Sequence, residues 1–63
     1  MTGLPLDGRR VLVVEDEYLI AEDLREQLEA SGARVIGPVG HLEVAIERAR
    51  EERIDVAVLD LNL

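Results

Sequence analysis

Residues 11–17 read VLVVEDE, four consecutive apolar residues that are followed at once by three carboxylic acids. A short continuous run of this kind, rich in β-branched residues, is typical of a strand that is buried on both faces. We therefore predict that residues 10–14 form a strand in the middle of a sheet. The acids of residues 15–17 then lie at the carboxyl end of that strand.

Beyond these acids the sequence alternates between helical and extended patterns. Apolar residues recur at helical spacing and end at a glycine, a common C-terminal stop; they are Ile20, Ala21, Leu24 and Leu28, followed by Gly32. Residues 33–36 predict a second strand that is closed by a turn at residues 37–40, GPVG. A second helix ends near residue 52, and residues 56–59, VAVL, predict a third strand.

The order β-α-β-α-β predicts an α/β fold with a three-stranded parallel sheet of strand order 2-1-3 and one helix on each face. Ligands of such open sheets bind beyond the carboxyl ends of the strands where the winding direction reverses, which here lies between strands one and three. Asp60 directly follows the third strand, and neighbouring strands lie about 4.8 Å apart. We therefore expect Glu15, Asp16 and Asp60 to converge.

Converging carboxylates predict a Mg²⁺ site, because this cation binds through one or two carboxylates and keeps several waters. Two carboxylates about 4 Å apart repel each other by roughly 4 kcal/mol at an effective dielectric constant of 20, and a cation relieves that repulsion. A second interpretation stays open. In it the three acids of residues 15–17, Glu15, Asp16 and Glu17, only favour the N-terminus of the first helix electrostatically, and Asp60 is an exposed residue at the end of a strand.

Composition narrows the function classes. The 63 residues carry a net charge of −7, which disfavours binding to nucleic acid or to anionic membranes. The chain lacks cysteine, so it forms no disulfide and no thiolate metal site. No stretch approaches the roughly 20 apolar residues that a membrane span needs, and residues 1–10 lack the apolar run of a secretory signal. We expect a cytoplasmic protein.

The motif VLVVEDE, the helical stripe after it, GPVG and the closing VLDLNL together resemble the first half of a response-regulator receiver domain, a truncated flavodoxin-like unit. The resemblance covers residues 10–63 and leaves residues 1–9 as an N-terminal leader. It implies that Asp60 is the phosphoacceptor and that Asp16 and Asp60 ligate Mg²⁺. It also implies that Glu15 acts through water and that Asn62 ligates through its backbone carbonyl. Glu15 stands where the family more often has Asp.

The same resemblance implies a histidine kinase or phosphotransfer protein as the partner that supplies the phosphoryl group. It implies no enzyme beyond autophosphorylation from a donor. Receivers also use a hydroxyl residue after a fourth strand and a lysine after a fifth. This chain has no lysine and ends before those strands, so we expect it to be incomplete as a switch.

Two further interpretations follow from the third strand. Residues 56–59 carry neither charge nor proline to protect an edge, so this strand is expected to recruit another one and to form a homodimer. The chain is then a non-signalling half-receiver that binds itself or a partner. An enzyme is the other alternative, because Asp60-Leu61-Asn62 faintly resembles the Asp-x-Asp nucleophile motif of haloacid-dehalogenase-type phosphatases; Glu15 and Asp16 have no place in that motif.

Overall fold

The computed structural model describes residues 3–60, and these form one three-stranded sheet with two helices. The elements in chain order are β1 (Arg10–Val14), α1 (Tyr18–Ala30), β2 (Arg34–Val39), α2 (Leu42–Glu51) and β3 (Val56–Leu59). All strands are parallel and the sheet order is β2-β1-β3, which confirms the predicted α/β topology. None of the helices in this part of the chain is long and apolar enough to cross a membrane.

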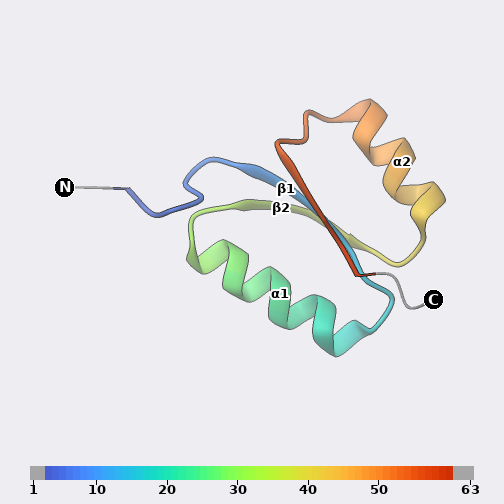
Figure 1. The fold of residues 1–63 in the computed structure, drawn as a ribbon, viewed down its shortest axis with the longest axis horizontal. Helices are drawn as coiled ribbons and strands as arrows, with labels where there is room; N and C mark the ends of the chain where they lie inside the picture. The colour runs from blue at the N-terminus through green and yellow to red at the C-terminus, as the bar shows by residue number, and fades with distance from the viewer. Residues whose placement is uncertain (1–2, 61–63) are drawn as a thin grey trace.

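The central strand β1 is the core of the molecule. Alternate side chains of β1 enter two separate apolar clusters, because successive residues of a strand point to opposite faces. Leu12 and Val14 pack with Ala45 of α2, whereas Val11 and Val13 pack with Leu24 of α1. Figure 1 shows the two helices on opposite sides of the strands. The continuous apolar sequence of β1 is therefore explained by burial on both faces.

Strand β2 is longer than the sequence predicts. The predicted turn at residues 37–40 is wrong, because β2 continues through Gly37 and Pro38 to the buried Val39. The pairing with β1 shifts by one residue along this stretch, from Leu12 opposite Ile36 to Val14 opposite Val39. This irregularity accommodates Pro38, which has no N–H to donate, and Gly37, whose φ of +98° disfavours other residues.

The N-terminal segment packs at the far end of the sheet from the acids. Its Leu6 N–H donates to the Ser31 carbonyl at 2.8 Å, and the Leu6 side chain contacts the cluster around Val11 and Val13. Its Gly8 N–H donates to the Gly32 carbonyl at 3.0 Å. Residues 4–8 thus cover the turn between α1 and β2.

Strand β3 is held in place at its start by polar contacts with β1. The Arg10 N–H donates to Asp55 Oδ2 at 2.8 Å, and the Arg10 guanidinium donates to the Arg53 carbonyl at 2.6 Å and to Glu52 Oε1 at 3.0 Å. These bonds align β3 with β1, so that Val14 lies opposite Leu59 at the other end. The alignment determines which acids meet beyond the strand ends.

Candidate functional site

The acids lie at the carboxyl ends of β1 and β3, as the sequence predicts. Glu15 is the first residue after β1, and its N–H donates to the Val39 carbonyl at 2.9 Å. Asp60 is the first residue after β3, and its N–H donates to the Val14 carbonyl at 3.0 Å. Because Val14 pairs with Leu59, the parallel register brings Glu15, rather than Asp16, next to Asp60.

Glu15 is the buried member of the group, with 5% of its surface exposed. The Glu17 N–H donates to Glu15 Oε1 at 2.9 Å and fixes the orientation of the carboxyl group. Glu15 Oε2 has no hydrogen-bond partner among the described residues. A buried polar oxygen without a partner is costly, so this oxygen favours a bound proton or cation.

The surroundings of Glu15 oppose its ionisation. The hydrogen bond from the Glu17 N–H by itself lowers the pKa of Glu15. The proximity of Asp60, burial and the proximity of Asp16 together outweigh it and raise the pKa of Glu15 above its usual value. The nearness of Asp60 is the largest of the raising effects, because a neighbouring carboxylate disfavours a further negative charge on Glu15. The structure therefore brings Glu15 within electrostatic contact of both aspartates.

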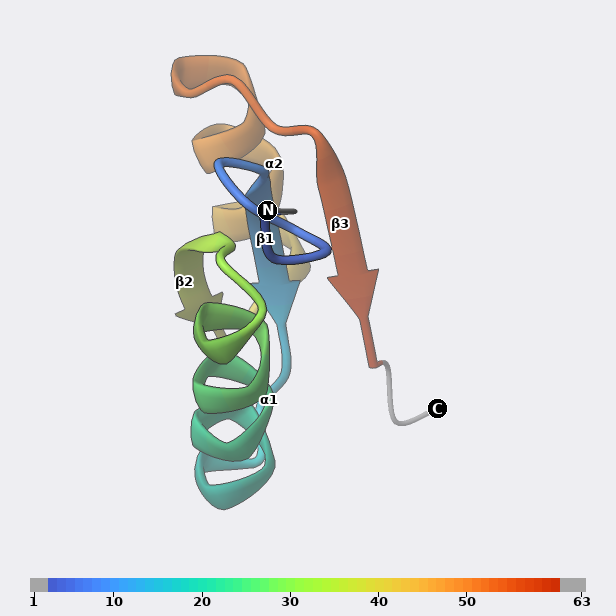
Figure 2. The same ribbon diagram turned by 90° about the vertical axis from the view of Figure 1, so that its left-hand side faces the viewer.

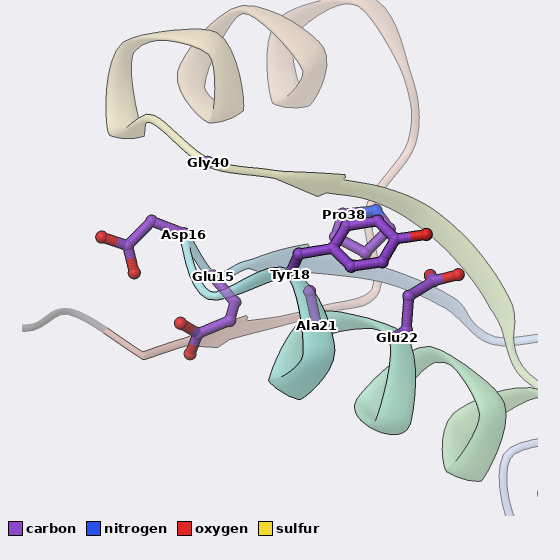
Figure 3. A pocket seen from close by; sticks show the side chains of 7 residues that line it. All are labelled: Glu15, Asp16, Tyr18, Ala21, Glu22, Pro38 and Gly40. Atoms are coloured by element: carbon purple, nitrogen blue, oxygen red, sulfur yellow. The ribbon is translucent and has the colours of Figure 1, made fainter.

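Asp16 and Asp60 differ from Glu15 in being exposed. Asp16 lies close to Gly40, since a Cβ added to Gly40 would be 3.8 Å from the Asp16 Cα. The Asp16 carboxylate extends outward beyond the strand end in Figure 3. Asp60 is open to solvent, which is the arrangement that an attacking carboxylate needs if its reaction partner is carried by another protein. Asn62, the remaining predicted ligand, lies outside the described residues.

The three acids fit a hard cation only with help from other ligands. Within residues 3–60, no three Asp, Glu or His side chains gather closely enough to hold a metal ion by themselves. The predicted set needs fewer side chains, since Mg²⁺ binds through one or two carboxylates and keeps waters and carbonyl oxygens as its other ligands. The unpartnered Oε2 of Glu15 and the two exposed aspartates are compatible with that chemistry.

A pocket that the sequence did not predict lies on the β2 side of the acids. It has a volume of about 240 Å³ and is lined by Glu15, Asp16, Tyr18, Ala21, Glu22, Pro38 and Gly40. Figure 3 shows the ring of Tyr18 beside that of Pro38. Asp60 does not line this pocket, so of the three predicted acids only Glu15 and Asp16 contribute to it. No sequence signal marks it, because it depends on β2 continuing through Pro38.

Comparisons with known proteins identify related sequences. The sequence pattern of the response regulator receiver domain family matches residues 11–63. The transcriptional regulatory protein PdtaR from two strains of Mycobacterium tuberculosis, CDC 1551 / Oshkosh and ATCC 25618 / H37Rv, is 37% identical over 68 residues. This alignment covers all of the present chain but 33% of PdtaR.

A third relative is protein-glutamate methylesterase/protein-glutamine glutaminase 5 of Anaeromyxobacter dehalogenans strain 2CP-C. It is 42% identical over 55 residues, which make up 86% of this chain and 15% of that protein. The alignment covers too little of that protein to support an inference about the esterase activity in its name. No solved structure matches the chain significantly. The chain spans about a third or less of the length of these relatives.

Proposed function

The chain belongs to the response regulator receiver domain family, and we propose that within this family it accepts a phosphoryl group on Asp60. The observation that carries the proposal is the position of Asp60. This carboxylate is exposed at the end of β3 and lies beside the buried Glu15, whose Oε2 has no hydrogen-bond partner within residues 3–60. The edge of the sheet thus presents the Asp60 carboxylate to the outside, with the buried carboxyl group of Glu15 behind it.

The proposed reaction is a transfer between two proteins. A carboxylate oxygen of Asp60 attacks phosphorus, the phosphorus–nitrogen bond of a phosphohistidine breaks, and an acyl phosphate forms. The family implies a histidine kinase or a phosphotransfer protein as the donor. The chain itself stays a phosphoacceptor and not an enzyme with turnover. A cytoplasmic location remains a prediction that suits this role.

We propose that Mg²⁺ supports the transfer. Asp16 and Asp60 would hold the ion directly, Glu15 would act through water, and Asn62 would contribute its backbone carbonyl. When bound, the ion neutralises charge on the transferring phosphoryl oxygens. Glu15 contributes by its fixed orientation, because the Glu17 N–H donates to Oε1, whereas Oε2 has no partner in the described part of the chain. The division into a leader at residues 1–9 and a receiver segment from residue 10 remains part of this proposal.

Intact-mass spectrometry after incubation with acetyl phosphate and Mg²⁺ tests the phosphoacceptor role. We expect one phosphoryl adduct on the parent chain and none on Asp60→Asn. Asp23→Asn is the matched control, because Asp23 is an exposed aspartate of α1 whose contact is a hydrogen bond from Gln27. An adduct that survives in Asp60→Asn, or a folded parent that stays unmodified, contradicts the proposal.

Partner binding through β3 is a second candidate function. It is favoured by a specific observation, namely that Val56 and Leu59 expose 46% and 53% of their surface on a strand that, within residues 3–60, pairs with β1 alone. The chain then acts as a binding module whether or not Asp60 is phosphorylated. The homodimer that the sequence predicts is one form of this function.

A further inference from the structure

Strand β2 contains one more residue than β1 immediately before the acids. The pairing of the two strands shifts by one residue, so that Gly37 and Pro38 together lie opposite Val13. An extra residue of this kind bends its strand and redirects the residues beyond it. In consequence Val39, instead of Pro38, pairs with Val14 at the end of β1. The bulge therefore determines which residue of β2 lies next to the acidic site.

The residue that the bulge brings to this position holds the first acid. The Val39 carbonyl accepts a hydrogen bond from the Glu15 N–H at 2.9 Å, just beyond the end of β1. The Val39 side chain is buried in one cluster with Val14 and Ala45. This packing anchors the carbonyl, because the side chain cannot move without leaving the cluster. The Glu15 backbone thus has a fixed position that depends on β2.

The end of β1 links both sides of the acidic site. Figure 2 shows β1 between β2 and β3. On the β2 side Glu15 bonds to Val39, and on the β3 side the Val14 carbonyl accepts the Asp60 N–H at 3.0 Å. The Glu17 N–H then orients the Glu15 side chain. A displacement of β1 and β2 relative to each other would therefore move Glu15 away from Asp60.

Gly37 is the position at which the bulge leaves no room for a side chain. Its φ is +98°, a conformation that residues with a Cβ rarely adopt. An added Cβ would lie 2.8 Å from the Val39 nitrogen and 3.0 Å from the Val13 carbonyl oxygen. Both atoms belong to the backbone, one in β2 and one in β1. A side chain at this position must therefore push the two strands apart next to Glu15.

We propose that Gly37 is a positioning residue for the acidic site and that it acts through Val39 on Glu15. Its lack of a side chain lets the bulge of β2 approach β1, and this approach places the Val39 carbonyl against the Glu15 N–H. Gly37 itself contacts neither the cation nor the phosphoryl group. The inference rests on the proposed function, because it names a residue that prepares the same site for Mg²⁺ and for phosphoryl transfer.

Amide hydrogen exchange measured by nuclear magnetic resonance tests the link between Gly37 and Glu15. The internal reference is the Arg34 N–H, which donates to the Arg9 carbonyl at 2.7 Å at the opposite end of the same strand pair. Global unfolding exposes both amides alike and cancels in the ratio of their exchange rates. In Gly37→Ala we expect the Glu15 rate to rise about tenfold relative to the Arg34 rate, as the loss of one hydrogen bond implies.

Gly32→Ala is the matched control. Gly32 also has a positive φ, of +93°, and an added Cβ would also lie 2.8 Å from a backbone atom, the Asp7 Cα. This clash lies at the far end of the sheet from the acids, so the ratio of the Glu15 rate to the Arg34 rate should not rise. An equal rise in both variants, no rise in Gly37→Ala, or an unprotected Glu15 amide in the parent chain overturns the proposal.

Gly37→Asn takes the place of Gly37→Ala if the alanine variant does not fold by circular dichroism. Asn adopts a positive φ at lower cost than Ala, whereas its Cβ makes the same two backbone contacts. The same rise in the exchange ratio is expected, and its absence in a folded Gly37→Asn equally overturns the proposal.

Titration with Mg²⁺, followed by the amide shift of Asp16, extends the test to the site itself. We expect Gly37→Ala to weaken Mg²⁺ binding about tenfold, as the loss of an outer-shell contact typically does. Gly32→Ala should bind Mg²⁺ within about twofold of the parent, because distant sites act independently. Equal affinities in Gly37→Ala and the parent overturn the positioning role and leave the proposed function intact. A folded parent without a Mg²⁺-dependent shift contradicts the proposed Mg²⁺ site instead, and the exchange ratio then decides the role of Gly37.

Discussion

Gly32 links the turn after α1 to the N-terminal segment, and replacing it with alanine should destabilise the fold strongly. Its φ is +93°, a backbone conformation that costs a residue with a Cβ about 1 kcal/mol or more. An added Cβ would also lie 2.8 Å from the Asp7 Cα and 3.1 Å from the Asp7 nitrogen. Both atoms belong to the backbone, so the N-terminal segment must move away.

The cost of that movement follows from the bonds that it breaks. Leu6 and Gly8 donate backbone hydrogen bonds to Ser31 and Gly32, and each is worth about 1 kcal/mol. Together with the backbone conformation, Gly32→Ala should cost about 3 kcal/mol. At roughly 4–8 °C per kcal/mol for a domain of this size, the melting temperature should fall by about 12–24 °C.

Gly8→Ala is the matched control. Gly8 also has a positive φ, of +76°, but an added Cβ would meet nothing within 4 Å. This variant carries the conformational cost alone, about 1 kcal/mol, so its melting temperature should fall by about 4–8 °C. Both variants restrict the unfolded chain equally, so that effect cancels in their difference. Thermal melts followed by far-ultraviolet circular dichroism at one protein concentration measure both. Equal shifts would refute the steric argument at Gly32.

Three further perturbations test the core and the acids. Val13→Ala should lower stability by about 2 kcal/mol, because Val13 is fully buried; urea unfolding should show a lower midpoint, and an unchanged midpoint contradicts the assigned core. Because the pKa of Glu15 is raised in the folded state, protonation of Glu15 stabilises the fold. This stabilisation is fully present below pH 4.5 and is lost as pH rises through the folded-state pKa. Without divalent cations, Glu15→Gln should therefore melt above the parent at pH 7 but not at pH 4, and a difference independent of pH opposes this assignment. The hydrogen bond from the Arg10 N–H is the main cause that lowers the pKa of Asp55, and the charge of Arg53 adds to it. The ionised Asp55 therefore stabilises the fold above pH 3.8, and this stabilisation is lost as pH falls through the folded-state pKa. Asp55→Asn should melt below the parent at pH 7 with a gap that closes in acid; a gap that persists at pH 2 argues against this bond.

The sequence was sufficient for the order of elements, because each signal is local. The apolar run at residues 11–14 requires burial on both faces, and this requirement places β1 in the centre of the sheet. The stripe that contains Leu24 and Leu28 matches the face of α1 that packs on the sheet. The acids that follow β1 and β3 were expected to meet, because parallel strands that are neighbours end at the same edge.

Other features depend on tertiary contacts that no local pattern encodes. The pair Gly37-Pro38 reads as a turn, yet pairing with β1 on both sides of an irregularity keeps it within β2. Three successive acids look alike in sequence, but the register of β1 and β3 and the Glu17 N–H make Glu15 the buried one. Residues 4–8 carry no regular pattern and are held by backbone bonds to the turn at Gly32. Local sequence therefore determined the elements and the acidic edge, whereas the packing of distant segments decided which acid is buried and where β2 ends.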